Sequence, residues 1–300
     1  MMNPLVSVVM PSYNSGKFIY KTIKSVISQT YDNWELVIVD NNSNDNTIQI
    51  INSFHDKRIK ILTINNCGII AASRNLGIKK SKGELIAFLD SDDLWYPSKL
   101  EVCVNYILDF EGFVCHSEIW SYRIDQNEVK RRKIHYGFNG KTSFNKLLFE
   151  GNCISTSAVV IHKKYLKKVD YFNESSSLIT VEDYHLWLKL LKEKIPVKFI
   201  PKVLGEFLIH GNNNSKANDK NLDALCNAFE LIYESYQPKN FIIKIKAIRR
   251  RAIIIYSGAR GFQSSGSFKK ATILLFKAIL RYPFVLKFYI ALIMSLFKIK

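Results

Sequence analysis

The stretch Leu85-Ile86-Ala87-Phe88-Leu89-Asp90-Ser91-Asp92-Asp93 decides the fold that this sequence predicts. Its five apolar residues predict a short buried strand, which ends on three carboxylates within four positions. Open α/β folds bind ligands at the edge where their strands end. Hard divalent cations prefer oxygen ligands, so these carboxylates would hold a metal and, through it, a substrate phosphate. In the alternative interpretation, Ser91 or Asp92 only caps the following turn. The four polar residues alone favour neither.

Three more segments have the length and the β-branched content of buried strands: 5–10, 35–40 and 58–64. Apolar residues recur at helical spacing between these segments, in 18–27, 48–54 and 71–79. Strands that alternate with helices in this way predict a parallel sheet with right-handed crossovers. The first hundred residues are therefore predicted to be Rossmann-like.

Polar residues follow the predicted strands where the chain leaves the sheet. Pro11-Ser12-Tyr13-Asn14 follows the first strand and Asp40-Asn41-Asn42-Ser43 follows the second. Parallel strands end at one edge, so these loops and the Asp90–Asp93 tetrad would form one crevice. The sequence has no GxGxxG after its first strand and no GxxxxGK[ST] anywhere. Phosphates are therefore expected to be held by metal and side chains.

Beyond residue 100 the pattern is mixed. It predicts a helix over 98–110, strands over 113–124 and 157–163, and a helix that starts near Thr180. The polar and basic stretch Asp125 to Phe144 is predicted to be a mobile loop, and the chain is predicted to be helical from Asn240 to its end.

The charge is concentrated in one part of the chain. The net charge is +17, but residues 239–300 contain fourteen Lys or Arg and no Asp or Glu, which leaves +3 for residues 1–238. This asymmetry predicts two parts with two tasks. Five scattered cysteines without a CxxC pair indicate core thiols rather than a disulfide framework or a zinc site. The start of the chain does not have the pattern of a signal peptide, so a cytoplasmic protein is expected.

Five short motifs follow one another along the chain: Val8-Val9-Met10-Pro11-Ser12-Tyr13-Asn14, Val39-Asp40-Asn41-Asn42-Ser43-Asn44-Asp45-Asn46-Thr47, Ser73-Arg74-Asn75-Leu76-Gly77, Phe88-Leu89-Asp90-Ser91-Asp92-Asp93 and Glu182-Asp183-Tyr184-His185-Leu186-Trp187. In this order they resemble family 2 of the glycosyltransferases, the large inverting group with the GT-A fold. The resemblance covers about residues 4–215.

The resemblance implies a nucleotide-sugar site at the predicted sheet edge. Pro11 and Tyr13 would frame the nucleotide base, and Asp40 would accept a hydrogen bond from a uracil ring. The family usually has a second acid after that aspartate, and this chain has Asn41, which leaves uridine or thymidine open. On the residues alone, Asp40 could instead begin an Asx turn, and Tyr13 could simply pack in a turn.

The resemblance also implies how the diphosphate is held. Arg74 matches an arginine near the diphosphate, where a planar bidentate cation suits phosphate oxygens. Asp92 would bind Mn²⁺ or Mg²⁺, with Asp90 toward the ribose and Ser91 in the same nucleotide-sugar site. A solvated helix position is the alternative for Arg74.

A second acid pair, Glu182-Asp183, precedes the apolar helical pattern that follows Thr180. The resemblance assigns Asp183 as the base that takes the proton from the acceptor hydroxyl, with Glu182 as the second candidate. The alternative is a capping box, in which Thr180 and Asp183 serve only the start of the helix. His210 would approach the metal or the diphosphate, or be structural; Leu208 stands where the family often has an arginine.

Three interpretations of the basic C-terminal part remain open. Segments 241–256 and 268–297 combine apolar faces with Lys and Arg, as expected of an anchor on an anionic membrane surface. The second interpretation is a helical hairpin that packs on itself or on the core; the membrane anchor, often combined with such a hairpin, is favoured because the segments are apolar as well as basic. Nucleic-acid binding is the third possibility, and the chain has no known motif for it.

Together these features predict an α/β protein with a GT-A, Rossmann-like mixed sheet and a C-terminal helical extension. The predicted parts are a catalytic domain over 1–215, with a nucleotide-binding half (1–100) and an acceptor half (101–215), and a basic amphipathic extension over 216–300. The predicted function is metal-dependent, inverting transfer from a nucleotide-sugar, UDP-linked by expectation, to a lipid-linked glycan in bacterial O-antigen or capsule synthesis, on the inner face of the membrane. The alternatives are a basic nucleic-acid-binding protein and a nucleotide-sugar-binding partner without turnover.

Overall fold

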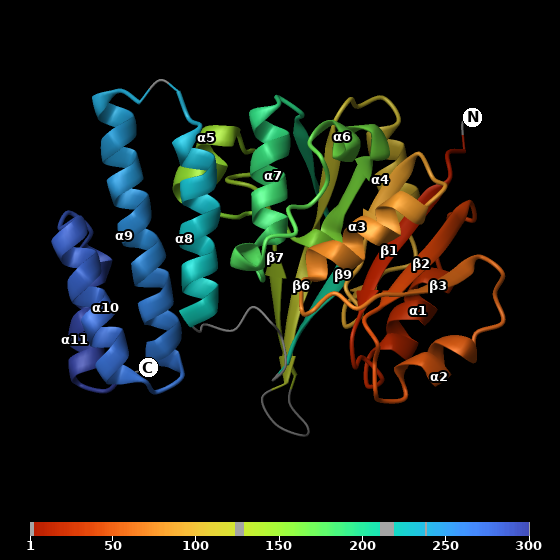
Figure 1. Cartoon of the computed structure of the whole chain (residues 1–300), viewed down its shortest axis with the longest axis horizontal. Helices are drawn as coiled ribbons and strands as arrows, with labels where there is room; N and C mark the ends of the chain where they lie inside the picture. Colours follow the sequence, from red (N-terminus) through yellow and green to blue (C-terminus); the bar gives the residue numbers. More distant parts are fainter. Residues whose placement is uncertain (1–2, 124–128, 211–218, 238, 300) are drawn as a thin grey trace. The chain divides into compact units, whose positions relative to one another are not determined.

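Nine strands of the described residues form one mixed β-sheet with the order β3-β2-β1-β4-β8-β6-β9-β5, and β7 pairs with β6 (Figure 1). The computed structural model describes residues 3–123, 129–210, 219–237 and 239–299. These residues belong to two compact units. Unit 1 comprises 1–144, 153–174 and 186–212, and it contains the sheet; unit 2 comprises 145–152, 175–185 and 213–300.

The first half of unit 1 is the predicted Rossmann-like layer. Strands β1 (Val6–Ser12), β2 (Trp34–Asp40), β3 (Ile59–Thr63) and β4 (Leu85–Phe88) are parallel, with β1 between β2 and β4. Every residue of β1, β2 and β4 is buried, as expected of strands covered on both faces. The crossovers are helices α1 (Ile19–Ile27), α2 (Thr47–Asn52) and α3 (Ile70–Lys80).

The second half of unit 1 reverses the strand direction. Strand β8 (Val159–His162) is antiparallel to β4 and β6 (Phe113–Arg123), and β9 (Val197–Ile209) runs parallel to β6. The two-residue strand β5 (Leu94–Trp95) follows the acidic tetrad and pairs with β9 at Glu206 and Gly205. The tetrad therefore lies between strand β4 and a strand that is hydrogen-bonded to the end of β9.

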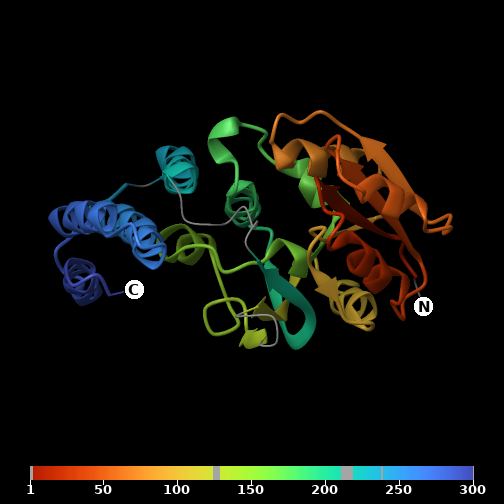
Figure 2. The ribbon, with the colours of Figure 1, turned by 90° about the horizontal axis from the view of Figure 1, so that it is seen from below.

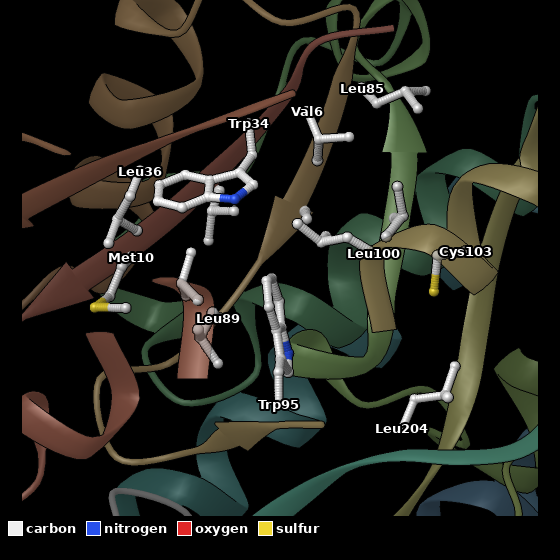
Figure 3. Packing of buried hydrophobic residues seen from close by; sticks show 14 of the residues in the cluster. Val6, Met10, Trp34, Leu36, Leu85, Leu89, Trp95, Leu100, Cys103 and Leu204 are labelled. Atoms are coloured by element: carbon white, nitrogen blue, oxygen red, sulfur yellow. The ribbon is translucent and has the colours of Figure 1, made fainter. Parts of the chain in front are cut away.

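The core of unit 1 connects these halves. Figure 3 shows Val6 and Met10 of β1 close to Trp34 and Leu36 of β2, with Trp95 beside Leu89. Helix α4 (Lys99–Ile107) contributes Leu100 and Cys103 to the same cluster, and β9 contributes Leu204. The turn that carries the tetrad is thus fixed on a rigid apolar base.

Unit 2 is helical. Helices α8 (Asp219–Glu234), α9 (Phe241–Ser264), α10 (Phe268–Arg281) and α11 (Leu286–Leu296) supply most of it. Figures 1 and 2 both show α9, α10 and α11 side by side. Alanines allow this close packing. Ala252 and Ala278 form one buried cluster with Phe288, and Ala259 and Ala291 form another with Leu275. Three further α-helices among the described residues are short or divided between the units: α5 (Phe144–Glu150), α6 (Lys163–Lys168) and α7 (Glu182–Lys192).

The structure confirms the predicted fold class and corrects one element. The predicted loop over Asp125 to Phe144 is wrong for Val129–Ile134, which form strand β7, antiparallel to β6. Residues 124–128 of that prediction lie outside the described part of the chain. The strand was hidden because its sequence, Val-Lys-Arg-Arg-Lys-Ile, is that of an exposed edge strand, where charges rather than alternating apolar residues are expected. Within the described residues, no helix has the length and apolarity needed to cross a membrane.

Candidate active site

Hydrogen bonds join the loops that follow β1, β2 and β4. Ser15 Oγ and Ser91 Oγ are 2.7 Å apart, which connects the first loop to the acidic tetrad. The Asn14 backbone N–H donates to Ser43 Oγ, and the Asn44 N–H donates in return to the Asn14 side chain. The three strand ends predicted to form one edge therefore do so, and hydrogen bonds between their loops hold them together.

The residues predicted to recognise the nucleotide base flank this edge. Pro11 lies in β1 opposite Val39, beyond the last β4 partner of β1 at Val9, so its missing N–H costs no ladder bond on that side. Tyr13 is exposed, with 58% of its surface accessible. Asp40 is buried, and its carboxylate accepts hydrogen bonds from Ser43 N and Ser43 Oγ. The Asx-type turn is therefore real, and base recognition by Asp40 stays a prediction.

Arg74 and Asp90 form an ion pair at this edge. Arg74 Nη2 donates to Asp90 Oδ1 at 2.7 Å. The arginine is 3% exposed, whereas the aspartate side chain is partly accessible. The guanidinium also lies over the ring of Phe172, 5.5 Å from its centroid. Arg74 is thus not the solvated helix residue of the alternative interpretation but a buried cation directed at the tetrad.

Asp92 pairs with His210, 118 positions later in the chain. Asp92 Oδ2 and His210 Nε2 are 2.8 Å apart, and the imidazole stacks on Phe18 with ring centroids 4.4 Å apart. Burial raises the pKa of Asp92, the charge of Asp90 raises it further, and the His210 hydrogen bond lowers it. A divalent cation would relieve the same penalty by neutralising both carboxylates.

These two side chains fit a metal that is completed by substrate. Among the residues that the structure describes, no three Asp, Glu, His or Cys side chains gather into a full metal cage. Asp92 and His210 supply one carboxylate and one imidazole, and Mg²⁺ and similar ions are often held by one or two protein ligands plus substrate phosphates. The donor set therefore suits Mn²⁺ or Mg²⁺ that arrives with a nucleotide diphosphate.

The fourth tetrad residue, Asp93, has a positional role that the sequence reasoning missed. It is 1% exposed, and its Oδ1 accepts the Leu208 backbone N–H of β9 at 3.1 Å. Ser157 Oγ donates to Asp93 Oδ2 at 2.5 Å and accepts the Asp90 backbone N–H at 3.1 Å. Asp93 thus ties the acidic loop to the end of strand β9, which His210 directly follows. The only sequence signal for this role of Asp93 was a third acidic residue in the turn.

Behind the tetrad lies a set of buried ionisable groups in unit 1. Glu118 accepts a hydrogen bond from Tyr136 Oη, and its pKa is raised to about 7, mainly by burial. Burial lowers the pKa of Lys99 to about 8 and that of His116 to about 3. The Lys99 ammonium lies 3.4 Å from the ring centroid of Trp95, which offers a cation–π contact.

The second predicted acid pair belongs to unit 2. Glu182 is buried and Asp183 is half-buried, and both lie in the first turn of α7. Thr180 has a φ of +81°, a strained value for a β-branched residue, and its buried hydroxyl has no hydrogen-bond partner among the described residues. The predicted alternative of a Thr180–Asp183 capping box is therefore wrong. Backbone strain of this kind is often found at functional sites.

A buried arginine from α9 supports this acid pair within unit 2. Arg250 Nη1 donates to the Glu150 carbonyl at 3.3 Å, and Nη2 donates to Tyr184 Oη at 3.5 Å. Tyr184 Oη in turn donates to the Leu147 carbonyl. The residue directly after Asp183 is therefore fixed by α5 and by the C-terminal helices.

The chemistry of the unit 1 edge is that of nucleotide diphosphate binding. It offers a fixed arginine, two accessible carboxylates and an imidazole at the ends of parallel strands. This combination neutralises and orients phosphates without a glycine-rich loop.

Comparisons with known proteins agree with this geometry. Two Escherichia coli enzymes are similar to the chain, both named UDP-Glc:alpha-D-GlcNAc-diphosphoundecaprenol beta-1,3-glucosyltransferase. WfgD is 38% identical over 63% of this chain and 70% of its own length. WfaP is 32% identical over 86% of this chain and 94% of its own length. Among solved structures, S. aureus TarS in complex with UDP-GlcNAc is 17% identical, with a TM-score of 0.65 over 98% of this chain and 87% of that chain.

The TarS likeness shows the fold, and the family follows from sequence. The model described as Glycosyl transferase family 2 matches residues 7–170, which contain the three joined loops, Arg74 and the complete tetrad. Nothing in these matches supports nucleic-acid binding. The chain belongs to glycosyl transferase family 2.

Proposed function

We propose that this protein is an inverting glycosyltransferase that moves a sugar from a UDP-sugar to a hydroxyl of a lipid-linked glycan, in the synthesis of a bacterial surface polysaccharide. Family membership supports sugar transfer. The names of both E. coli relatives specify a UDP-Glc donor and a diphosphoundecaprenol-linked acceptor. The single observation that carries the proposal is the pair of contacts Arg74–Asp90 and Asp92–His210 on one strand-end edge.

In this proposal the donor binds across the edge. Pro11, Tyr13 and Asp40 take the uridine, and Asp90 with Ser91 takes the ribose side. Arg74, which donates to Asp90 Oδ1 at 2.7 Å, would turn toward the diphosphate oxygens, because a planar guanidinium can bind phosphate through two parallel N–H groups. Asp92 and His210 would hold Mn²⁺ or Mg²⁺, which when bound supplies positive charge that stabilises the departing diphosphate.

We assign the proton transfer to Asp183, with Glu182 as the second candidate. The base must lie within hydrogen-bond reach of the acceptor hydroxyl. The start of a helix keeps a carboxylate ionised, because the positive end of the helix dipole favours negative charge. Asp183 would deprotonate the hydroxyl as its oxygen attacks the anomeric carbon from the face opposite the diphosphate. An α-linked donor then yields a β-linked product.

Donor binding is tested by thermal unfolding with a panel of UDP-sugars and dTDP-sugars, each with and without Mn²⁺. A ligand at one hundred times its Kd stabilises the native state by about 2.7 kcal/mol. We expect a UDP-sugar to raise the transition temperature only with metal. Asp92→Asn should remove the shift, and Asp109→Asn, at an exposed aspartate of unit 1, should retain it. A panel with no metal-dependent shift would refute the donor assignment.

The base is tested with Asp183→Asn. Loss of a general base typically costs 10²- to 10⁴-fold in rate. We expect transfer to GlcNAc-diphospholipid to fall by that range while metal-dependent UDP binding stays at the wild-type level. Glu182→Gln is the matched comparison in the same helical turn. Normal turnover in Asp183→Asn with a large loss in Glu182→Gln would move the assignment to Glu182.

We also propose a peripheral location on the cytoplasmic face of the cell membrane, with residues 240–300 toward anionic lipid. A lipid-linked acceptor supports this location, because its diphosphate lies at the membrane surface. The fourteen cations and absent acids of residues 239–300 provide the matching charge.

A further inference from the structure

Helices α10 and α11 carry apolar stripes that face solvent. On α10 the exposed residues are Ile273, Phe276 and Leu280, at helical spacings of three and four. On α11 the stripe continues along almost the whole helix with Leu286, Tyr289, Ile290, Ile293 and Leu296. Phe284, in the turn between the helices, is 84% exposed. Large apolar residues exposed along one face of a helix indicate an interaction site.

These stripes are not part of the packed core of unit 2. The opposite faces of the same helices are already packed, because Ala278 and Phe288 meet Ala252 of α9, and Leu275 and Ala291 meet Ala259. Each helix therefore has a buried face of mostly small residues and an outward face of large ones. Helices α10 and α11 therefore pack on α9 with their inner faces and expose their outer faces.

The charges next to the stripes identify the partner. Lys277 and Arg281 are exposed and each lies one position after an exposed apolar residue of α10, at the border of its stripe. Residues 239–300 contain no acid, so a second copy of this chain would bring like charge to the same surface. Nucleic acid would satisfy the cations but not the apolar residues. An anionic bilayer satisfies both.

We infer that α10, α11 and the turn between them form a membrane-binding face that lies in the plane of an anionic bilayer. The apolar stripes enter the boundary between headgroups and acyl chains, and Lys277 and Arg281 bind lipid phosphates. This inference rests on the proposed membrane location and narrows it from sixty residues to two short helices.

The first test measures binding of the full chain to vesicles of phosphatidylcholine, with and without phosphatidylglycerol. Leu280→Ser/Phe284→Ser/Leu286→Ser removes three large apolar groups that are at least 75% exposed, so the packed faces remain intact. We expect affinity for anionic vesicles to fall at least tenfold. The matched control is Phe241→Ser/Ile242→Ser, which removes exposed apolar residues from the start of α9 and should change affinity by less than threefold.

The charge contribution has its own variant. Lys277→Gln/Arg281→Gln should weaken binding to anionic vesicles by about fivefold per cation, and added salt should reproduce the loss. Binding to pure phosphatidylcholine should be much weaker than to anionic vesicles for the wild type. Equal affinity for neutral and anionic vesicles would overturn the inference.

Depth is measured with Phe284→Trp. All four native tryptophans lie in unit 1, at 34, 95, 120 and 187, so a tryptophan at 284 reports on unit 2 alone. We expect a blue shift with vesicles and quenching by lipids brominated on their acyl chains. Tyr20→Trp, at an exposed position of α1, should show neither.

The remaining outcomes separate this inference from the proposed function. The serine variant should transfer sugar normally to a short-chain, water-soluble acceptor, because it leaves the unit 1 edge and Asp183 unchanged. Wild-type affinity in the serine variant, or an equal loss in the α9 control, would overturn the membrane face. So would a wild-type dimer that dissociates in the serine variant. Failure of sugar transfer by a wild-type protein that binds anionic vesicles as expected would count against the proposed function alone.

Discussion

Asp93 is a buried side chain that connects several parts of the site without needing to touch a phosphate. Its two oxygens bind the Leu208 N–H and the Ser157 hydroxyl, and Ser157 in turn accepts the Asp90 N–H. His210 directly follows the end of strand β9, two residues after Leu208. Asp93 therefore sets the distance between the two prospective metal ligands, as residues behind metal ligands commonly do.

A double-mutant cycle tests this role. We expect Asp93→Asn to weaken metal-dependent UDP binding about tenfold, within the range seen when such supporting contacts are removed. In a His210→Ala background the same change should cost less than twofold, because the residue that Asp93 positions is gone. Calorimetric titration of UDP with and without Mn²⁺ supplies all four affinities. Additive losses would show that Asp93 acts only through stability.

At the scale of elements, helix α3 depends on a glycine for its position. A Cβ on Gly77 would lie 2.6 Å from Val9 Cγ1 of β1 and 3.3 Å from Val39 Cγ2 of β2. The helix therefore packs against the sheet more closely than any side chain would permit. Arg74 lies one turn earlier on this helix, so the depth of packing also places the guanidinium beside Asp90.

Gly77→Ala should accordingly affect stability and binding together. Overpacking costs about 1–3 kcal/mol, and the displaced helix should raise the Kd for UDP by several-fold. Lys80→Ala, exposed on the same helix, should change the free energy of unfolding by less than about 0.5 kcal/mol. Urea unfolding followed by tryptophan fluorescence measures the first quantity and calorimetry the second. If Gly77→Ala lowered the stability but left the Kd for UDP unchanged, the packing depth of α3 would not be what places the Arg74 guanidinium.

The contrast between β1 and β9 shows which elements the sequence could predict. Strand β1 is buried along its whole length, so its apolar run and the polar residues after it predicted both strand and loop. Strand β9 mixes buried, half-buried and exposed residues, and no strand was predicted there. Helix α8 lies inside the helical extension predicted over 216–300, although its own bounds were not predicted.

Prediction from the sequence had similar limits in the candidate active site. Arg74, Asp90 and Asp92 were predicted because each belongs to a short motif with a chemical reason. The Asp92–His210 and Asp93–Leu208 contacts join residues more than a hundred positions apart, and local patterns contain no information on such pairs. The Thr180 capping box failed because strained backbone at a β-branched residue contradicts local propensity.

At the scale of the whole molecule, charge is divided between tasks. The helices of residues 239–300 carry the excess cations. Unit 1 instead buries ionisable groups, which are either uncharged or close to a partner. Glu118, with a pKa of about 7, is the clearest of these groups. Its carboxyl is protonated in the fold at a pH where an unfolded glutamate is ionised.

This difference predicts how stability depends on pH. The pKa of Glu118 is raised from 4.5 to about 7, so its stabilising contribution is complete below pH 4.5 and is lost as the pH rises to 7. Glu118→Gln keeps an acceptor for Tyr136 and has no proton to lose. Relative to the wild type, the variant should gain roughly 3 kcal/mol between pH 4 and pH 8, at 1.36 kcal/mol per pKa unit.

The comparison between variants removes the effects of the other buried groups. His116 has a lowered pKa of about 3 and opposes Glu118 between pH 3 and 6.5, but it contributes equally to both proteins. Urea unfolding from pH 4 to pH 8, followed by the tryptophans of unit 1, gives the difference directly. Glu84→Gln, at an exposed glutamate, should show no such trend. If the stability of the wild type relative to Glu118→Gln did not fall up to pH 8, Glu118 would be ionised in the fold. Lys99 would then be the candidate for its counter-charge.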